Sequence, residues 1–242
     1  MDRLTGKTVL VTGASSGIGR AVALSCAQAG ADVALVARSR GALEEVARLV
    51  QEAGGRAVVC VADVGDEAQI LAAVDEAHRA LGPIHVLVNN AGMNVTERTI
   101  RDTSSQQWRQ LMEVNLTSAF LFTKAILPEM IERGGGTIIN LASRSTLHPG
   151  LLGGVAYSAS KQGMDALTQI TNEEANAHGV RACMLCPGTV NTPIVDRRSR
   201  PPSPTERQHL LQPEDVAEVV LLMASLPPRV NVELVSMVQT VG

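Results

Sequence analysis

The chain has 242 residues, 45% of them hydrophobic, which is enough to bury a large core in one α/β domain. Its formal net charge is −3 at pH 7, with acidic and basic residues mixed along it, so it offers no basic field for nucleic acid. No apolar run reaches the roughly 18 residues that a membrane span needs, and residues 1–7 lack the apolar core of a signal peptide. We therefore expect a soluble cytoplasmic protein, a single domain over residues 1–242 with no nucleic-acid or membrane partner.

Short apolar runs alternate with longer amphipathic stretches. The apolar runs predict strands over residues 7–12, 32–37, 57–62, 85–89, 136–141, 180–186 and 232–238. The amphipathic stretches predict helices that begin near Gly17, Arg40, Glu67, Ser105, Val155 and Pro213. Runs such as 9–11 and 58–61 are continuously apolar, as in parallel strands covered on both faces. The predicted fold class is α/β, a three-layer doubly wound parallel sheet of about seven strands with helices on both faces.

One segment departs from this alternation. Residues 196–204 are basic and rich in proline, with neither a helical nor a strand period. We expect an exposed loop there.

Four cysteines raise the question of a metal site or a redox pair. Cys183 and Cys186 form a Cys-x-x-Cys sequence, but on the strand predicted there residues three apart point to opposite faces. Cys26 and Cys60 lie in apolar stretches, and no histidine pair has metal-ligand spacing. The sequence predicts four reduced, buried thiols and no metal site.

A glycine-rich turn follows the first predicted strand and leads directly into a helix. It reads Thr12-Gly13-Ala14-Ser15-Ser16-Gly17-Ile18-Gly19. Glycines permit tight backbone geometry and the close approach of a ligand, and the free N–H groups of the helix attract a pyrophosphate. Its position after the first strand predicts a dinucleotide site in a Rossmann fold, and the alternative is a glycine-rich connector that binds nothing.

The end of the second predicted strand indicates which dinucleotide would bind. NAD-binding sheets usually carry an acid there for the ribose 2′-hydroxyl, whereas here Ala37 is followed by Arg38 and Arg40. Asp32 comes too early, at the start of the strand. Because a guanidinium favours a 2′-phosphate, we expect NADP(H) in preference to NAD(H), unless both arginines are only solvated loop cations.

The single tyrosine of the chain, Tyr157, stands four residues before Lys161. If the segment is helical, this spacing puts both side chains on one face, and the ammonium lies near the phenol oxygen. A nearby cation favours the phenolate and brings the pKa of a tyrosine towards the working range of an acid or base. The alternative is a core aromatic beside a solvated lysine.

Further short motifs accompany these features. They are Asp63-Val64, Asn89-Asn90-Ala91-Gly92, Asn115, Ser143 and Pro187-Gly188-Thr189-Val190-Asn191-Thr192. Together with the glycine turn and the Tyr157 and Lys161 pair, they resemble the short-chain dehydrogenase/reductase family in its compact, single-domain form. The resemblance covers nearly the whole chain.

The resemblance implies hydride transfer between a nicotinamide ring and a carbonyl or secondary alcohol of a small substrate. Tyr157 would give or take the proton on the substrate oxygen, while Lys161 would hold the nicotinamide ribose and lower the pKa of the tyrosine. Ser143 would bind the same substrate oxygen, unless it is only a turn residue. Asn115 would kink its helix, which follows Trp108, and hold a water that links Lys161 to solvent, unless it is a plain surface residue.

The resemblance also implies cofactor contacts. Asp63 would accept from the adenine amino group and Val64 would pack on that ring, the alternatives being a helix N-cap and ordinary core. Residues 89–92 would let backbone lie against the ribose, and they also suit a tight turn. Val190 and Thr192 would meet the carboxamide, unless Thr192 is only a cap. The residues expected at the cofactor are Gly13, Ser15, Ser16, Gly17, Ile18, Gly19, Arg38, Asp63, Val64, Asn89, Asn90, Ala91, Gly92, Tyr157, Lys161, Pro187, Gly188, Val190 and Thr192.

The substrate is less constrained by sequence. Residues 193–211 form a short, proline-rich lid by analogy with the family, which suggests a small or extended substrate, and their arginines either meet an anionic carrier or are solvated. The pocket rim is expected to include Met93, Leu147, Leu151 and Leu152, with His148 facing either the substrate or solvent.

Two other functions stay open. Residues 232–242 lack the ending common in acyl-carrier reductases, which weakens the alternative of a 3-oxoacyl-carrier-protein-type reductase. A non-catalytic NADP(H)-sensing protein is the second alternative. In the family, helices like those beginning near Ser105 and Val155 form the dimer face, so we expect a homodimer or homotetramer.

Overall fold

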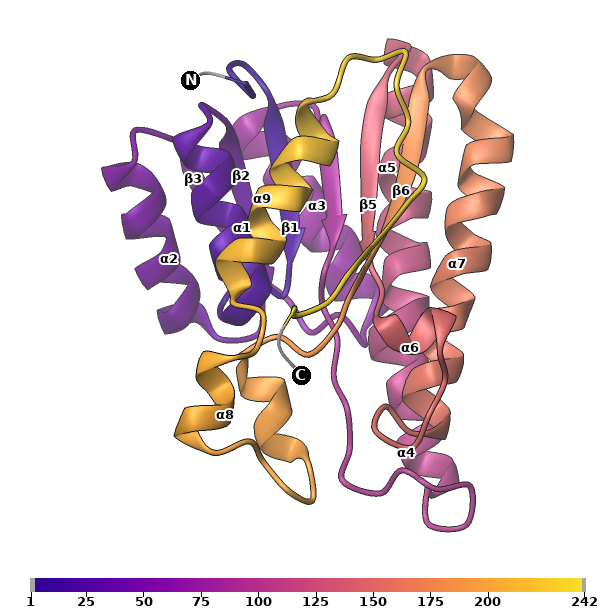
Figure 1. Cartoon of the computed structure of the whole chain (residues 1–242). Helices are drawn as coiled ribbons and strands as arrows, with labels where there is room; N and C mark the ends of the chain where they lie inside the picture. The colour runs from indigo at the N-terminus through magenta and orange to yellow at the C-terminus, as the bar shows by residue number, and fades with distance from the viewer. Residues whose placement is uncertain (1–2, 241–242) are drawn as a thin grey trace.

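The computed structural model describes residues 3–240 and contains one parallel sheet covered by helices on both faces (Figure 1). Within that range the strand order is β3-β2-β1-β4-β5-β6-β7. The strands are β1 Thr8–Thr12, β2 Asp32–Ala37, β3 Ala57–Val61, β4 Val86–Asn89, β5 Gly136–Leu141, β6 Val180–Pro187 and β7 Leu234–Met237. The predicted doubly wound α/β fold is confirmed. The ends of the domain expected over 1–242, Met1–Asp2 and Val241–Gly242, lie outside the described residues.

The helices form two layers around the sheet. They are α1 Gly17–Gln28, α2 Arg40–Glu52, α3 Glu67–Leu81, α4 Ser105–Met112, α5 Ser118–Arg133, α6 Arg144–Leu147, α7 Val155–Ala175, α8 Pro204–Gln208 and α9 Pro213–Ser225. All six predicted helix starts are confirmed. Helices α1, α2 and α9 pack on one face and α3, α5 and α7 on the other, each against its own apolar cluster (Figure 1).

Two segments need comment. The helix expected to be kinked at Asn115 is α4, a π-helical segment Glu113–Thr117 and α5 in succession, so its regular geometry is interrupted at that residue. The exposed loop expected over residues 196–204 is helical at both ends: Pro193–Arg197 is a 3-10 helix and α8 begins at Pro204. Helix α8 starts there because Ser203 and Glu206 form a capping box, a pattern that the proline content obscured.

The four cysteines are buried and free, as predicted. Burial raises the pKa of Cys26 and Cys60 to about 12 and that of Cys183 to about 11. Cys183 and Cys186 belong to different apolar clusters, since alternate strand positions face opposite sides of the sheet. Among residues 3–240, no three His, Cys, Asp or Glu side chains gather as metal ligands.

Helices long and apolar enough to cross a lipid bilayer are absent from the described range.

Arg181 is a buried charge that joins β6 to the end of α9. Its side chain is 7% exposed, and it donates to the carbonyls of Pro227 and Leu226, both at 2.9 Å. Longer bonds of 3.4 Å reach Met223 and Ala224, in the last turn of α9. The carbonyls of the last helical turn have no partner within the helix, so a cation there satisfies them and opposes the negative end of the helix dipole. The Pro227 carbonyl also accepts from the Val230 N–H at 2.9 Å.

Replacement of this arginine therefore leaves several carbonyls without donors. We expect Arg181→Met to lower the free energy of unfolding by about 2–4 kcal/mol, measured by urea denaturation. The control is Arg229→Met, at an exposed position in the same region, with an expected change below about 0.5 kcal/mol. Equal effects of the two substitutions would contradict the capping role.

Candidate functional site

A cavity of about 1430 Å³ follows the carboxyl ends of the strands. It is centred where β1 lies between β2 and β4, the point at which the winding of the sheet reverses and ligands of this fold class bind. Most predicted site residues line it: Gly13, Ser15, Ser16, Gly17, Ile18, Arg38, Asp63, Val64, Asn90, Ala91, Gly92, Ser143, Tyr157, Lys161, Pro187, Gly188, Val190 and Thr192. Gly19, Asn89 and Asn115 do not line it, although all three were expected at the site.

The glycine turn has the geometry of an anion cradle. Gly13 has a φ of +66°, and a Cβ on Gly19 would lie 2.3 Å from the Gly13 carbonyl oxygen. Gly19 thus lets α1 pack directly under the turn, and it does not face the cavity because it supports the cradle from behind. Ser16 is the N-cap of α1 but makes no side-chain capping bond, and the first turn carries no acid. The free N–H groups fit a pyrophosphate, so the residues present suit a dinucleotide.

Thr12 holds the two central strands together beneath this cradle. Its hydroxyl accepts from the backbone N–H groups of Asn90 and Ala91, both at 2.9 Å. The Asn90 side chain returns a bond of 2.8 Å to the Thr12 carbonyl. Sequence reasoning placed Thr12 in the motif but gave it no role, although a threonine ending an apolar strand is a signal for such a bond.

The Asn89 side chain lies outside the cavity lining, although this residue was expected at the cofactor. It is buried and donates to Asn140 Oδ1 at 2.9 Å and to Thr123 Oγ1 at 3.3 Å. The side chain thus joins β4 to β5 and α5, and the contact of the 89–92 backbone with the ribose stays a prediction.

The β2 and β3 ends of the cavity carry a separate polar group. Arg38 is exposed, with Nη1 4.0 Å from the Asp63 carboxylate. Asp63 accepts from the Gly65 N–H, whereas Asp66 caps α3, so the alternative of Asp63 as that cap is wrong. Ser39 lines the cavity as the N-cap of α2, with no side-chain capping bond.

The remaining charges near β2 are already paired. Arg40 lies outside the cavity lining and pairs with Glu44 at 3.9 Å. Asp32 bonds Arg56 at 2.7 Å. Arg38 also has an acidic neighbour, Asp63, but unlike Arg40 it lines the cavity, as does Ser39.

Tyr157 and Ser143 meet on the opposite wall. Tyr157 is in the first turn of α7, and Ser143 is the N-cap of α6 just after β5. Burial raises the pKa of Tyr157 above its ordinary value, while the hydrogen bond with Ser143 and the charges of Arg98 and Arg198 act in the lowering direction. We expected Lys161 to lower this pKa, and this role stays a prediction.

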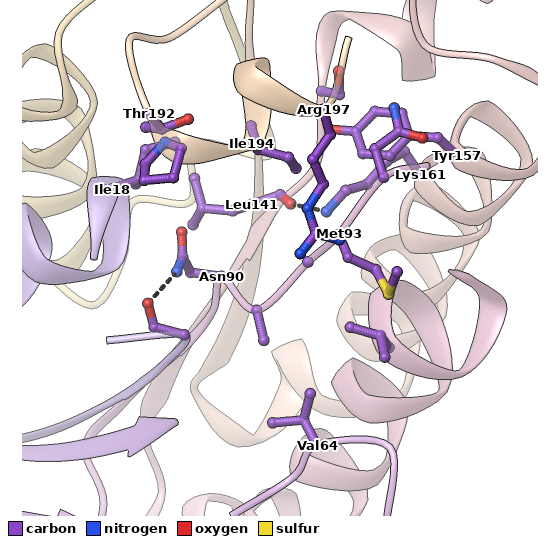
Figure 2. A pocket seen from close by; sticks show the side chains of 18 of the residues that line it. Ile18, Val64, Asn90, Met93, Leu141, Tyr157, Lys161, Thr192, Ile194 and Arg197 are labelled. Carbon is purple, nitrogen blue, oxygen red and sulfur yellow. Dashed lines mark hydrogen bonds between the residues drawn. The ribbon is translucent and has the colours of Figure 1, made fainter. Parts of the chain in front are cut away.

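Lys161 is buried rather than solvated. Its side chain is 3% exposed, and Nζ donates to the Leu141 carbonyl at 2.6 Å (Figure 2). Nζ lies 5.9 Å from the centre of the Tyr157 ring, on the same side of α7. Burial lowers the pKa of Lys161 to about 8. The alternative of a core tyrosine beside a solvated lysine is wrong for the lysine.

Asn115 lies directly behind the lysine. It is fully buried in the π-helical segment, accepts from Met93 N at 2.8 Å and donates to Ser160 Oγ at 3.1 Å. A Cβ on Gly92 would lie 3.5 Å from Asn115 Oδ1 and 3.6 Å from Lys161 Nζ. Asn115 is therefore not a surface residue: it fixes the backbone between β4 and the substrate region beside the lysine, without itself lining the cavity.

The substrate end differs from the predicted rim. Met93, His148 and Leu152 line the cavity, whereas Leu147 and Leu151 do not. Thr192 bonds the Val190 carbonyl at 3.4 Å, and a Cβ on Gly17 would meet its methyl group at 2.9 Å.

Three arginines at this end were not predicted as site residues: Arg98, Arg197 and Arg198. In Figure 2 Arg197 reaches into the cavity on the side of Tyr157 and Lys161. The arginines of residues 193–211 were expected either to meet an anionic carrier or to be solvated, whereas no sequence pattern marked Arg98.

The chain is similar in sequence and fold to known proteins. A short chain dehydrogenase family model matches residues 7–202. A ketoacyl reductase, HetN, from Nostoc sp. is 39% identical over 79% of this chain, which spans 66% of that protein.

Two solved structures are similar over nearly the full length. One is an alcohol dehydrogenase from the archaeon Thermococcus sibiricus complexed with 5-hydroxy-NADP, with 29% identity, a TM-score of 0.87 and 97% of each chain covered. The other is a metagenomic short-chain oxidoreductase in complex with NADP, with 32% identity, a TM-score of 0.86 and coverage of 99% of this chain and 100% of that one. The chain belongs to the short-chain dehydrogenase/reductase family, whose members are oxidoreductases acting on CH–OH and C=O groups of small molecules.

Proposed function

We propose that this chain is an NADP(H)-dependent oxidoreductase that interconverts a carbonyl and a secondary alcohol on a small substrate, with Tyr157 as the acid and base. The observation that carries this proposal is the position of Tyr157, Ser143 and Lys161 on one wall of a cavity that begins at the glycine turn. One ligand spanning the cavity would bring its far end next to a phenol and a buried ammonium.

Each residue has a defined part in the reduction. The bound nicotinamide supplies the hydride to the carbonyl carbon, or accepts it in the reverse direction. Ser143 donates to the carbonyl oxygen, and Tyr157 gives that oxygen its proton. The tyrosine then regains a proton from solvent. Lys161 has three N–H donors: one bonds the Leu141 carbonyl at 2.6 Å, and one makes a weak bond to Met164 Sδ at 3.4 Å. The third donor remains for a ribose hydroxyl, and the weak bond to sulfur can be exchanged for a second.

The preference for NADP(H) rests on Arg38 and Ser39. Both line the cavity at the start of α2, where a 2′-phosphate would meet a guanidinium, a hydroxyl and the positive end of a helix dipole. Arg38 is held near Asp63 at 4.0 Å, a contact weak enough to exchange for a phosphate. Two similar structures are complexes with NADP or its 5-hydroxy derivative.

A 3-oxoacyl reductase is the second candidate, favoured by the similarity to the Nostoc ketoacyl reductase. It uses the same acid and base, so it differs in the substrate and not in the mechanism. Turnover of a 3-oxoacyl thioester well above that of simple ketones would favour it.

We also propose assembly into a homodimer or homotetramer. Helices α4, α5 and α7 expose Trp108, Phe120 and Ile170, which are 39%, 46% and 58% exposed. Apolar side chains of this size on neighbouring helices are typical of an interface between subunits.

The tyrosine is tested by removal of its hydroxyl alone. We expect Tyr157→Phe to lower kcat about 10³-fold with ketones, aldehydes and keto esters, because the proton donor is lost, while NADPH binding measured by fluorescence is retained. The matched control is Gln169→Ala, on the exposed side of the same helix. Unchanged turnover in the phenylalanine variant would contradict the mechanism. Tight NADPH binding by the unaltered protein without turnover of any carbonyl would favour a cofactor sensor.

The cofactor preference is tested at Arg38. We expect Arg38→Gln to raise KM for NADPH about 10- to 100-fold and to leave KM for NADH within about threefold, because only the phosphate loses a charge-assisted bond. Arg40→Gln is the control, since Arg40 pairs with Glu44 outside the cavity. Equal effects on both cofactors, or a clear preference of the unaltered protein for NADH, would overturn the assignment.

The buried ammonium of Lys161 gives a pH signature. Its folded-state pKa of about 8 lies below the ordinary 10.5, so burial penalises the folded state at low pH, and the penalty disappears as pH rises between these values. We expect the stability of Lys161→Met relative to the unaltered protein to fall by about 1–2 kcal/mol between about pH 7.5 and 9.5.

This comparison uses urea denaturation at both pH values. Taking the difference between two variants removes the titration of the buried thiols, whose raised pKa values destabilise both proteins at high pH. Lys124→Met, at an exposed position, should show no such trend. A pH-independent difference for Lys161→Met would mean that the ammonium is not penalised by burial.

A further inference from the structure

Two loops bring arginines to the substrate end of the cavity. Arg98 comes from the segment between β4 and α4, and Arg197 and Arg198 come from the segment after β6. The Arg98 guanidinium joins the loops, because Nη2 donates to the Arg197 carbonyl at 3.4 Å. The charges of Arg98 and Arg198 both reach the Tyr157 phenol.

These arginines lack the acidic partners that the neighbouring ones have. In the same segment, Arg200 pairs with Glu206 and Arg207 pairs with Asp196. Within residues 3–240, no carboxylate forms an ion pair with Arg98, Arg197 or Arg198. Burial lowers the pKa of both Arg98 and Arg198, and the charge of Arg98 lowers that of Arg198 further. Two partly buried cations therefore lie near one another, and neither forms an ion pair with a carboxylate of residues 3–240.

Both guanidiniums keep free donors. Of its five N–H donors, Arg98 uses three, towards the carbonyls of Val95, Leu152 and Arg197. Arg198 uses one, towards Thr189 Oγ1 at 3.0 Å. The backbone bonds hold Arg98 in place, and the remaining donors are available to a ligand. Arginine donors fixed in this way suit a planar carboxylate, which accepts two parallel bonds.

The acidic lining of the cavity lies elsewhere. It comprises Asp63, Asp66 and Glu113. Gly65 lies between Asp63 and Glu113, since a Cβ on it would be 3.4 Å and 3.9 Å from their side chains, so these acids belong to the β3 end. The acids of the cavity therefore lie away from Tyr157, at the end where Arg38 pairs with Asp63, and Arg98 and Arg198 keep their positive charge at the Tyr157 end.

We propose that the substrate is an oxo acid or hydroxy acid, whose carboxylate is bound by Arg98 and Arg198 while its carbonyl or hydroxyl lies at Ser143 and Tyr157. Arg197 adds a third positive charge at the mouth. This inference rests on the proposed function and specifies its substrate class. The short lid agrees with a small substrate. Because Arg98 donates to the Arg197 carbonyl, the short segment after β6 lies close to the proposed anion site.

The test uses matched substrates that differ only in charge. With saturating NADPH, the carboxylates are 2-oxobutanoate, 3-oxobutanoate and 4-oxopentanoate, and each has its methyl ester as the neutral partner. We expect the unaltered enzyme to prefer at least one carboxylate over its ester by about tenfold or more in kcat/KM. Arg98→Met and Arg198→Met should each lower kcat/KM for that carboxylate about 10- to 100-fold, chiefly through KM, and leave the ester within about threefold.

Controls separate charge from folding. Arg200→Met removes an exposed, paired arginine of the same segment and should leave the preference unchanged. Equal losses for acid and ester in both cavity variants would reduce the arginines to a structural role and overturn the proposal. Esters that react as well as acids with the unaltered enzyme would also overturn it, while leaving the proposed function intact.

A binding measurement tests the anion site in the case that no substrate is turned over. If neither series is turned over, the proposed function fails, and the anion site is judged by calorimetry of 4-oxopentanoate with the enzyme and NADP⁺. Binding that weakens about tenfold in both Arg98→Met and Arg198→Met would support the site, and binding unchanged by them, or absent, would overturn it.

Discussion

A buried ammonium at the end of β5 is the constraint around which the site is arranged. Lys161 is 3% exposed, and its Nζ has one short bond, to the Leu141 carbonyl at 2.6 Å. Burial disfavours the charged form, so helix α7 has to be held firmly against the sheet to keep the lysine in place. The bond from Asn140 to Thr168, at 2.8 Å, and that from Thr146 to the Lys161 carbonyl, at 3.2 Å, do this from β5 and α6. These two buried hydrogen bonds therefore help to keep the Lys161 side chain in place.

Positive charge near the Tyr157 phenol comes from two arginines that the sequence did not identify as neighbours of the tyrosine. A lysine four residues after a tyrosine shares its helix face, but the shared face does not determine where the ammonium points. Here it turns to Leu141, and the cations that act on the Tyr157 phenol are Arg98 and Arg198. Because burial still raises the pKa of Tyr157, the phenol stays protonated at neutral pH, which is the state needed to donate a proton during carbonyl reduction.

Local sequence patterns predicted the fold because each element of the sheet carries its own signal. Continuous apolar strands, the glycine turn and the helix starts depend on neighbours within a few residues. Asn89 and Asn115 show what such reasoning does not reach: Asn89 bonds Asn140, 51 residues away, and Asn115 bonds Ser160, 45 residues away. Whether a buried amide faces a ligand or a neighbouring element depends on those distant partners, which spacing alone does not reveal.

The charge balance of the lid arginines could be predicted from the sequence, but their neighbour Arg98 could not. Residues 196–207 contain four arginines and two acids, Asp196 and Glu206, and both acids are used by Arg200 and Arg207. The surplus of two positive charges is visible in the sequence, and it corresponds to the two arginines that line the cavity, 197 and 198. The contribution of Arg98 is not visible, because it depends on a loop 99 residues earlier folding against the lid. Arg98 and Arg198 are both partly buried and have no acidic partner, which costs free energy in a protein interior. A ligand that supplies the missing negative charge would offset this cost.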